Sequence, residues 1–98
     1  NKILVMWKIN NISVSDYYGD DVIDVPENVL NEIREAVTTL YYANIEYPDI
    51  TGYNFIRHNN KLWILDFGHA KYNTDAFTYD PHIINFIKGS NKWNEKFL

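Results

Sequence analysis

An amphipathic segment between Asp24 and Ala43 constrains the fold more than any other part of the chain. Its apolar residues recur at the i, i+4, i+7, i+8 and i+11 positions of one helical face: Val29, Ile33, Ala36, Val37 and Leu40. A helix of roughly four to five turns with one apolar face has to bury that face against another element. The sequence therefore predicts a long helix lying on a core that the flanking segments supply.

The ends of this helix also carry signals. Asp24 and Glu27 have the spacing of a capping box, and Pro26 suits a first turn, where its missing N–H costs nothing. Beyond Ala43, Pro48 and Gly52 predict an irregular loop. We therefore expect the helix to occupy residues 24–43.

The segments before the helix are of two kinds. "KILVMWKI", from Lys2 to Ile9, is rich in bulky and β-branched residues and predicts a buried strand. Residues 13–24 hold Gly19 and four aspartates, so we expect a solvated loop with one short helical turn at its start. The aspartate spacing is not that of an EF-hand, which argues against calcium.

Two elements follow the irregular loop. Phe55–Arg57 and Leu62–Leu65 read as strands joined by a tight turn at Asn59-Asn60, because asparagine tolerates positive φ. A polar loop then leads to "DPHIINFIKG", which predicts a short helix capped by Asp80, opened by Pro81 and closed by Gly89. The sequence thus predicts an α+β fold, mostly helical, in a single domain over residues 1–98.

Composition excludes several classes of function. The 98 residues carry a net charge of −4 with no basic stripe, which argues against nucleic-acid binding. No apolar run approaches the roughly 20 residues that span a bilayer, and no signal peptide is evident, so we expect a soluble intracellular chain, most simply cytoplasmic. There is no cysteine, and the three histidines are scattered, so structural zinc is not expected.

Three oxygen-bearing side chains carry the chemistry. Asp49 and Asn54 lie in the loop after the long helix, and the hairpin returns the chain so that Asp66 comes beside them. Carboxylate and amide oxygens are ligands that Mg²⁺ accepts, and a bound phosphate supplies further ones. A remaining carboxylate can accept a hydroxyl proton while the metal neutralises charge on a transferring phosphoryl group.

The order Asp49-x-x-x-x-Asn54, hairpin, Asp66-Phe67-Gly68 resembles the catalytic loop and DFG motif of the protein-kinase fold. The start, "ILVMWKINN", looks like the strand and hinge that join the two kinase lobes. The compact motifs "DIT" and "DFGHA" resemble small, divergent kinases of large DNA viruses. The resemblance covers residues 3–70 well and the remainder loosely.

The resemblance implies a role for each matching residue. Asp49 is expected to be the catalytic base, with Asn54 and Asp66 as ligands of Mg²⁺ bound with ATP. Phe67 is expected to pack and Gly68 to allow the turn. Met6, Trp7 and Ile9 are expected to contact the adenine, although residues such as Met6 and Trp7, taken on their own, are more often core residues than adenine contacts. His69 is expected to be a loop histidine without a role.

The chain also departs from the kinase pattern. Tyr47-Pro48 stands where kinases have His-Arg, so control by phosphorylation of the activation loop is not expected, and Thr51 leaves the acceptor open. The glycine-rich loop, the strand lysine and its glutamate partner would belong upstream of Asn1. We therefore expect residues 1–12 to be the strand and hinge, residues 13–98 to be a kinase-like carboxyl lobe, and an amino lobe or partner chain to complete it.

Three functions remain open at this point. The first is an ATP- and Mg²⁺-dependent phosphotransferase acting on a Ser/Thr-type hydroxyl, as part of a longer chain. The second is a pseudokinase or interaction module without turnover. The third is a small-molecule kinase like those that act on aminoglycosides or choline.

Overall fold

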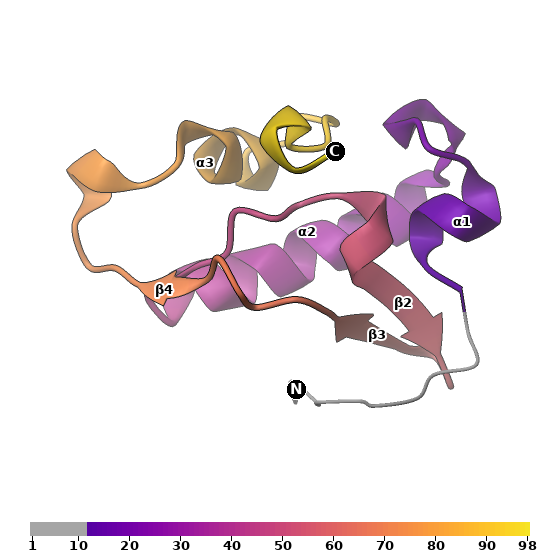
Figure 1. The fold of residues 1–98 in the computed structure, drawn as a ribbon, viewed down its shortest axis with the longest axis horizontal. Helices are drawn as coiled ribbons and strands as arrows, with labels where there is room; N and C mark the ends of the chain where they lie inside the picture. The colour runs from indigo at the N-terminus through magenta and orange to yellow at the C-terminus, as the bar shows by residue number, and fades with distance from the viewer. Residues whose placement is uncertain (1–11) are drawn as a thin grey trace.

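The long amphipathic segment forms helix α2 (Glu27–Tyr42), and the other elements of the computed structural model pack around it (Figure 1). The structure describes residues 12–98, which form an α+β fold with three α-helices and two small antiparallel sheets. Helix α3 and the carboxyl-terminal segment lie along one side of α2, and a β-hairpin lies along the other (Figure 1). The predicted strand Lys2–Ile9 lies outside the described residues, as do the expected adenine contacts Met6, Trp7 and Ile9.

The helix is where its periodicity predicts, but the expected capping box is wrong. Asp24 belongs to a separate 3-10 turn, η1 (Val22–Asp24), and Pro26 is the N-cap residue, without a side-chain cap. Proline disfavours helical backbone at the residue before it, and Val25 is accordingly extended, with φ −92° and ψ 128°. The helix therefore cannot begin before Pro26.

The acidic segment before α2 is more ordered than the predicted loop. It contains helix α1 (Val14–Tyr18), which agrees with the expected helical turn, as well as η1. The Ser13 hydroxyl accepts a hydrogen bond from the Asp16 backbone N–H at 3.1 Å and so caps α1. Val14 is buried in the core, which anchors this segment to the rest of the fold.

The predicted hairpin is confirmed. Strand β2 (Phe55–His58) pairs with β3 (Lys61–Ile64) in antiparallel register, with Phe55 opposite Ile64. Asn59 and Asn60 have φ values of 54° and 60°, the left-handed conformation that a two-residue hairpin turn requires. The second strand ends one residue earlier than predicted, which leaves Leu65 outside it.

This turn gives a first testable result. Asn60→Ala is expected to lower the free energy of unfolding by about 1 kcal/mol, because a Cβ without a polar partner is costly in the left-handed region. Asn60→Gly is the matched control and should change it by less than about 0.5 kcal/mol, since glycine adopts positive φ freely. Urea denaturation of both variants measures the difference, and equal stabilities would contradict the assigned turn.

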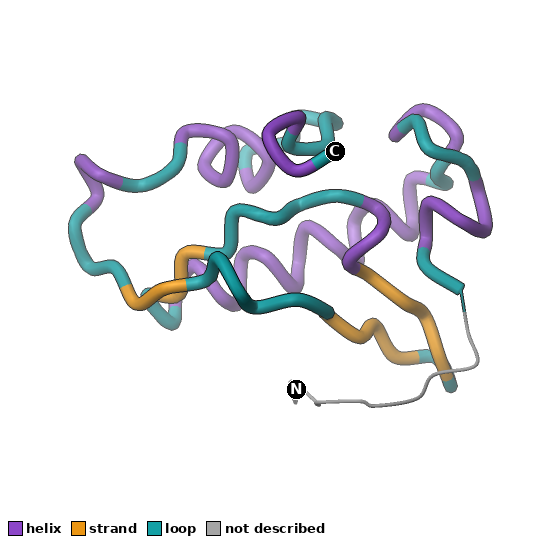
Figure 2. The backbone as a smooth tube through the Cα atoms, viewed as in Figure 1, coloured by secondary structure: helices purple, strands orange, loops and turns teal. Residues whose placement is uncertain are grey.

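A second sheet was not predicted. Strand β1 (Ile45–Glu46) pairs with β4 (Lys71–Tyr72), so that two short pieces of what were read as loops lie side by side (Figure 2). Strands of two residues are too short to show an alternating pattern. This pairing fixes the segment after Gly68 against the end of α2.

Helix α3 (Pro81–Ile87) is confirmed together with its cap. The Asp80 carboxylate accepts from the His82 backbone N–H at 2.9 Å, and Gly89 has the positive φ that follows many helices. Phe86 is fully buried between α3 and α2, and the Arg34 guanidinium lies 4.9 Å from the centre of its ring. The two helices are thereby locked together.

The core lies between α2, α3 and the hairpin. Its fully buried residues come from these three parts and, in the case of Ile50, from the loop after residue 46: Val29, Ile33, Ile50, Phe55, Ile83 and Phe86. Trp93 is buried beyond α3 and precedes a last turn, η4 (Glu95–Phe97). Among residues 12–98, no helix combines the length and apolar character needed to cross a membrane.

Candidate functional site

Asp49 lies in the loop between β1 and a 3-10 turn, η2 (Gly52–Asn54), and is only 3% exposed. Its neighbours Tyr47 and Ile50 are buried in the core, which draws the loop inward. One carboxylate oxygen, Oδ2, lies 2.9 Å from Nδ1 of His69. The other, Oδ1, is buried without a hydrogen-bond partner in the described part of the chain. A buried carboxylate with an oxygen left unpaired is costly for a purely structural group.

Asn54 is tied directly to this loop. Its side-chain Nδ2 donates to the backbone carbonyl of Asp49 at 2.9 Å, which fixes the orientation of the amide. The amide oxygen Oδ1 then receives no hydrogen bond from residues 12–98. The backbone carbonyl of Asn54 accepts from the N–H of Leu65 at 2.8 Å, so Asn54 also joins the loop to the segment that carries Asp66.

Asp66 follows β3 in an unusual conformation. Its φ is 56°, in the left-handed region that few residues other than glycine adopt, and its side chain is exposed. Oδ1 accepts from the Gly68 N–H at 3.2 Å. A Cβ at position 68 would lie 3.2 Å from that same oxygen, so any larger residue there would require the Asp66 side chain to shift slightly. Such backbone conformations cluster at functional sites.

Tyr47 joins the two aspartate segments. Its hydroxyl donates to the Leu65 carbonyl at 2.5 Å, and its ring packs 5.1 Å from the ring of Phe67. Burial raises the pKa of Tyr47 far above its ordinary value, with further contributions from the charges of Asp49 and then Asp66. The charges of Asp49 and Asp66 therefore both raise the pKa of the Tyr47 hydroxyl. Phe67 packs as expected.

His69 is the residue that sequence reasoning missed. Its Nδ1 contacts Asp49 across 20 positions of sequence, and its ring lies 4.9 Å from the ring of Phe97. The hydrogen bond to Asp49 and the Asp49 charge raise the pKa of His69; burial opposes this, and Asp66 adds to it. Its position directly after Gly68 is the only sequence signal that could have indicated this contact.

The side-chain oxygens of Asn54 and Asp66 would need further ligands, such as phosphate oxygens, to hold a magnesium ion. Within the described residues, no group of three or more His, Cys, Asp or Glu side chains could hold a metal ion. Asn54 and Asp66 nevertheless offer one amide oxygen and one carboxylate, and Mg²⁺ is commonly held by one or two carboxylates with phosphate and water oxygens. Two protein oxygens would leave the remaining positions around a magnesium ion to phosphate and water oxygens.

A cleft of about 360 Å³ lies elsewhere, between α2 and the β1 and β3 strands. Leu40, Ile45, Leu62 and Ile64 line it, and none of Asp49, Asn54 and Asp66 does. Asp49 and Asn54 are instead linked by a hydrogen bond, and Asp66 follows Leu65, whose N–H donates to the Asn54 carbonyl.

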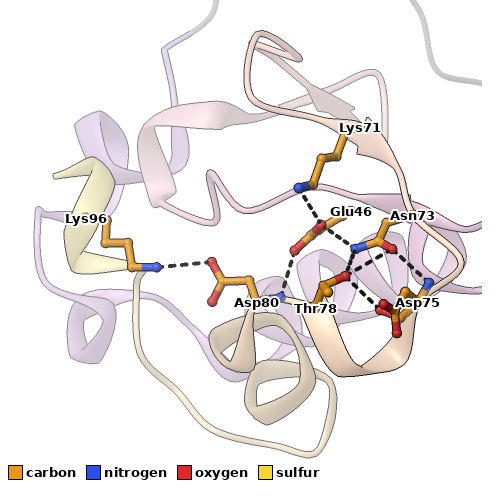
Figure 3. A network of polar contacts seen from close by, with 7 residues as sticks. All are labelled: Glu46, Lys71, Asn73, Asp75, Thr78, Asp80 and Lys96. Carbon is orange, nitrogen blue, oxygen red and sulfur yellow. Dashed lines mark hydrogen bonds and ion pairs between the residues drawn. The ribbon is translucent and has the colours of Figure 1, made fainter.

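A second polar cluster holds the segment that follows His69 (Figure 3). Glu46 is 4% exposed, and its carboxylate accepts from the side-chain amide of Asn73 at 2.9 Å and from the Asp80 backbone N–H at 2.7 Å. The Lys71 ammonium lies 3.7 Å from the same carboxylate. Asn73 and Thr78 hydrogen-bond each other, so the chain between β4 and α3 is fixed from both ends.

Comparison with known proteins adds no relative. No family model matches the chain, and no match was found among curated proteins or solved structures.

Proposed function

We propose that this protein is an ATP- and Mg²⁺-dependent phosphotransferase of the protein-kinase fold, acting on a Ser/Thr-type hydroxyl. The observation that carries the proposal is the linkage of Asp49, Asn54 and Asp66. The Asp49 carboxylate is buried with one oxygen unpaired, and the Asn54 side chain donates to the Asp49 backbone carbonyl. The Asn54 backbone carbonyl in turn accepts from Leu65, the residue before the exposed Asp66. Proton acceptance and metal binding are separate tasks, and two carboxylates in different surroundings can divide them.

Each residue has a distinct task in this proposal. Asn54 and Asp66 hold Mg²⁺, which when bound neutralises charge on the phosphates of ATP. The Asp49 carboxylate provides the negative charge that draws off the acceptor hydroxyl's proton. The acceptor oxygen then forms a bond to the γ-phosphorus, and the bond from that phosphorus to ADP breaks. Phe67 and Gly68 maintain the conformation of Asp66.

Nucleotide binding requires more than this group of residues. We assign adenine contacts to Met6, Trp7 and Ile9 by resemblance to the kinase hinge, and the phosphate-gripping loop and lysine to an amino lobe or a partner chain. The chain is therefore to be tested in its full-length native form.

The class of phosphate acceptor distinguishes the proposed Ser/Thr kinase from its nearest alternative, a small-molecule kinase. The Gly68 that follows Asp66-Phe67 favours the Ser/Thr kinase. The segment between β4 and α3 is short and tied to the buried Glu46, and this is the observation that favours the alternative, a kinase with a reduced peptide-docking surface and a small-molecule acceptor. A Ser/Thr kinase and a kinase of amino alcohols or aminoglycosides would use the same three residues.

Transfer of labelled phosphate from γ-³²P-ATP separates these cases. With full-length protein and Mg²⁺, we expect label in a degenerate Ser/Thr peptide library and less in choline or kanamycin. Label in the small molecules alone would assign the alternative acceptor class. ATP binding without transfer to any of them, in the presence of Mg²⁺ or Mn²⁺, would contradict enzymatic function and favour a pseudokinase.

A further inference from the structure

Asp49 is poorly placed to touch an acceptor hydroxyl itself. Its side chain is 4% exposed, Oδ1 is buried, and Oδ2 is occupied by His69 at 2.9 Å. The His69 side chain, in contrast, is 61% exposed. A group that removes a proton from a substrate has to reach that proton directly or through one water molecule. Of the two members of this pair, only His69 meets the solvent.

The hydrogen bond also determines which ring nitrogen is basic. An ionised carboxylate can only accept, so Nδ1 of His69 must donate its proton to Oδ2 of Asp49. In the neutral ring, the lone pair is then on Nε2, on the other side of the imidazole. A buried aspartate that holds Nδ1–H in this way both fixes the tautomer and stabilises the imidazolium that forms when Nε2 takes up a proton.

We propose that Nε2 of His69 is the atom that accepts the acceptor hydroxyl's proton, and that Asp49 acts through it. This inference rests on the proposed phosphotransfer and changes only the identity of the base. The hydroxyl proton passes to Nε2 as the oxygen bonds to the γ-phosphorus and ADP leaves. The imidazolium then releases the proton to solvent, so no further reactant is needed.

The surroundings of His69 agree with this role. Two carboxylates, Asp49 and Asp66, are the charged groups that raise its pKa above the ordinary value of 6.5. From η4, the uncharged Phe97 ring contacts the imidazole, while the Lys96 ammonium is directed to Asp80 at 3.7 Å. Because the neutral ring is the base, turnover should rise with pH through the raised pKa of His69 and level off above it.

Two substitutions at this position separate catalysis from structure. His69→Asn keeps an N–H near the place of Nδ1 and can still hydrogen-bond Asp49, but it has no basic nitrogen. His69→Gln removes the base as well. Each is expected to lower kcat by about 10²-fold or more, with little change in KM for ATP, and to abolish the pH-dependent rise. His58→Gln makes the same substitution at a histidine of the hairpin. It is the control and should retain the wild-type kcat and its rise with pH.

The outcome that overturns this inference is specific. If His69→Asn keeps wild-type kcat and its pH dependence, the contact is structural and Asp49 accepts the proton itself. If wild-type protein transfers phosphate to neither peptides nor small molecules, the proposed function fails, and this inference with it. Transfer that survives in His69→Asn overturns the histidine role alone.

A spectroscopic measurement tests the pairing without relying on turnover. In full-length protein labelled with ¹⁵N-histidine, His69 should titrate above 6.5 with Nδ1 protonated in the neutral form. Asp49→Asn should lower that pKa, since it removes the charge that raises it. A His69 titration unchanged by Asp49→Asn would show that no such pair exists and would overturn the inference.

Discussion

Asp66→Asn is expected to lower phosphate transfer by about 10³-fold or more while leaving the protein folded. The change removes one negative charge from the proposed magnesium site, and we expect its effect to reach the range of about 10³–10⁵ that an arginine stabilising the transition-state charge of phosphoryl transfer contributes. Stability should change by less than about 0.5 kcal/mol. The residue is exposed, asparagine tolerates its left-handed backbone, and an amide oxygen can still accept from Gly68.

Asp75→Asn is a matched control for this experiment. Asp75 is also exposed, and its carboxylate makes the same kind of contact, accepting from the backbone N–H two residues later, in Phe77, at 3.0 Å. The control removes the same charge and preserves the same turn, so it should keep full turnover. The measurement is kcat for γ-³²P transfer at saturating Mg-ATP, with urea denaturation of each variant. If Asp66→Asn keeps turnover within tenfold of wild type, the metal role assigned to Asp66 is wrong.

Elements with a long repeat in sequence could be predicted, and short pairings could not. Helix α2 was predicted because five apolar residues mark one face, and the β2–β3 hairpin because two asparagines adjoin two apolar runs. The capping box failed because Pro26 fixes the helix start, which outweighs the spacing of Asp24 and Glu27. The β1–β4 pairing depends on two residues from each side, and no periodic signal can arise from so few.

The candidate site likewise has residues that the sequence indicated and one contact that it did not. Motif order led to Asp49, Asn54 and Asp66, and the structure links the first two directly and the last through Leu65. Their chemical roles remain predictions. The contact between His69 and Asp49 depends on how the loop after Gly68 turns back over the site. That path is set by the β1–β4 pairing and by Glu46, neither of which sequence spacing revealed.

Glu46→Ala is expected to have the largest effect on stability, lowering the free energy of unfolding by about 3 kcal/mol. Hydrogen bonds to a charged group contribute about 1.5–3 kcal/mol each, and the Glu46 carboxylate accepts two, from Asn73 and from the Asp80 backbone N–H. The Lys71 side chain is 66% exposed, so its ion pair with Glu46 adds little. A loss of this size is a large part of the total stability of a small domain.

Hydrogen exchange shows whether Glu46→Ala loosens only the segment between β4 and α3 or destabilises the whole fold. Without Glu46, the amide N–H groups between β4 and α3 should exchange with deuterium faster than those of α2, because the carboxylate that holds the Asn73 side chain and the Asp80 N–H is gone. Glu46→Gln keeps the volume and one acceptor oxygen, so its loss should be intermediate. Glu35→Ala, an exposed glutamate on α2, should stay within about 0.5 kcal/mol of wild type. If Glu46→Ala were as stable as Glu35→Ala, the buried carboxylate would not be what holds this segment, and the path that brings His69 to Asp49 would need another cause.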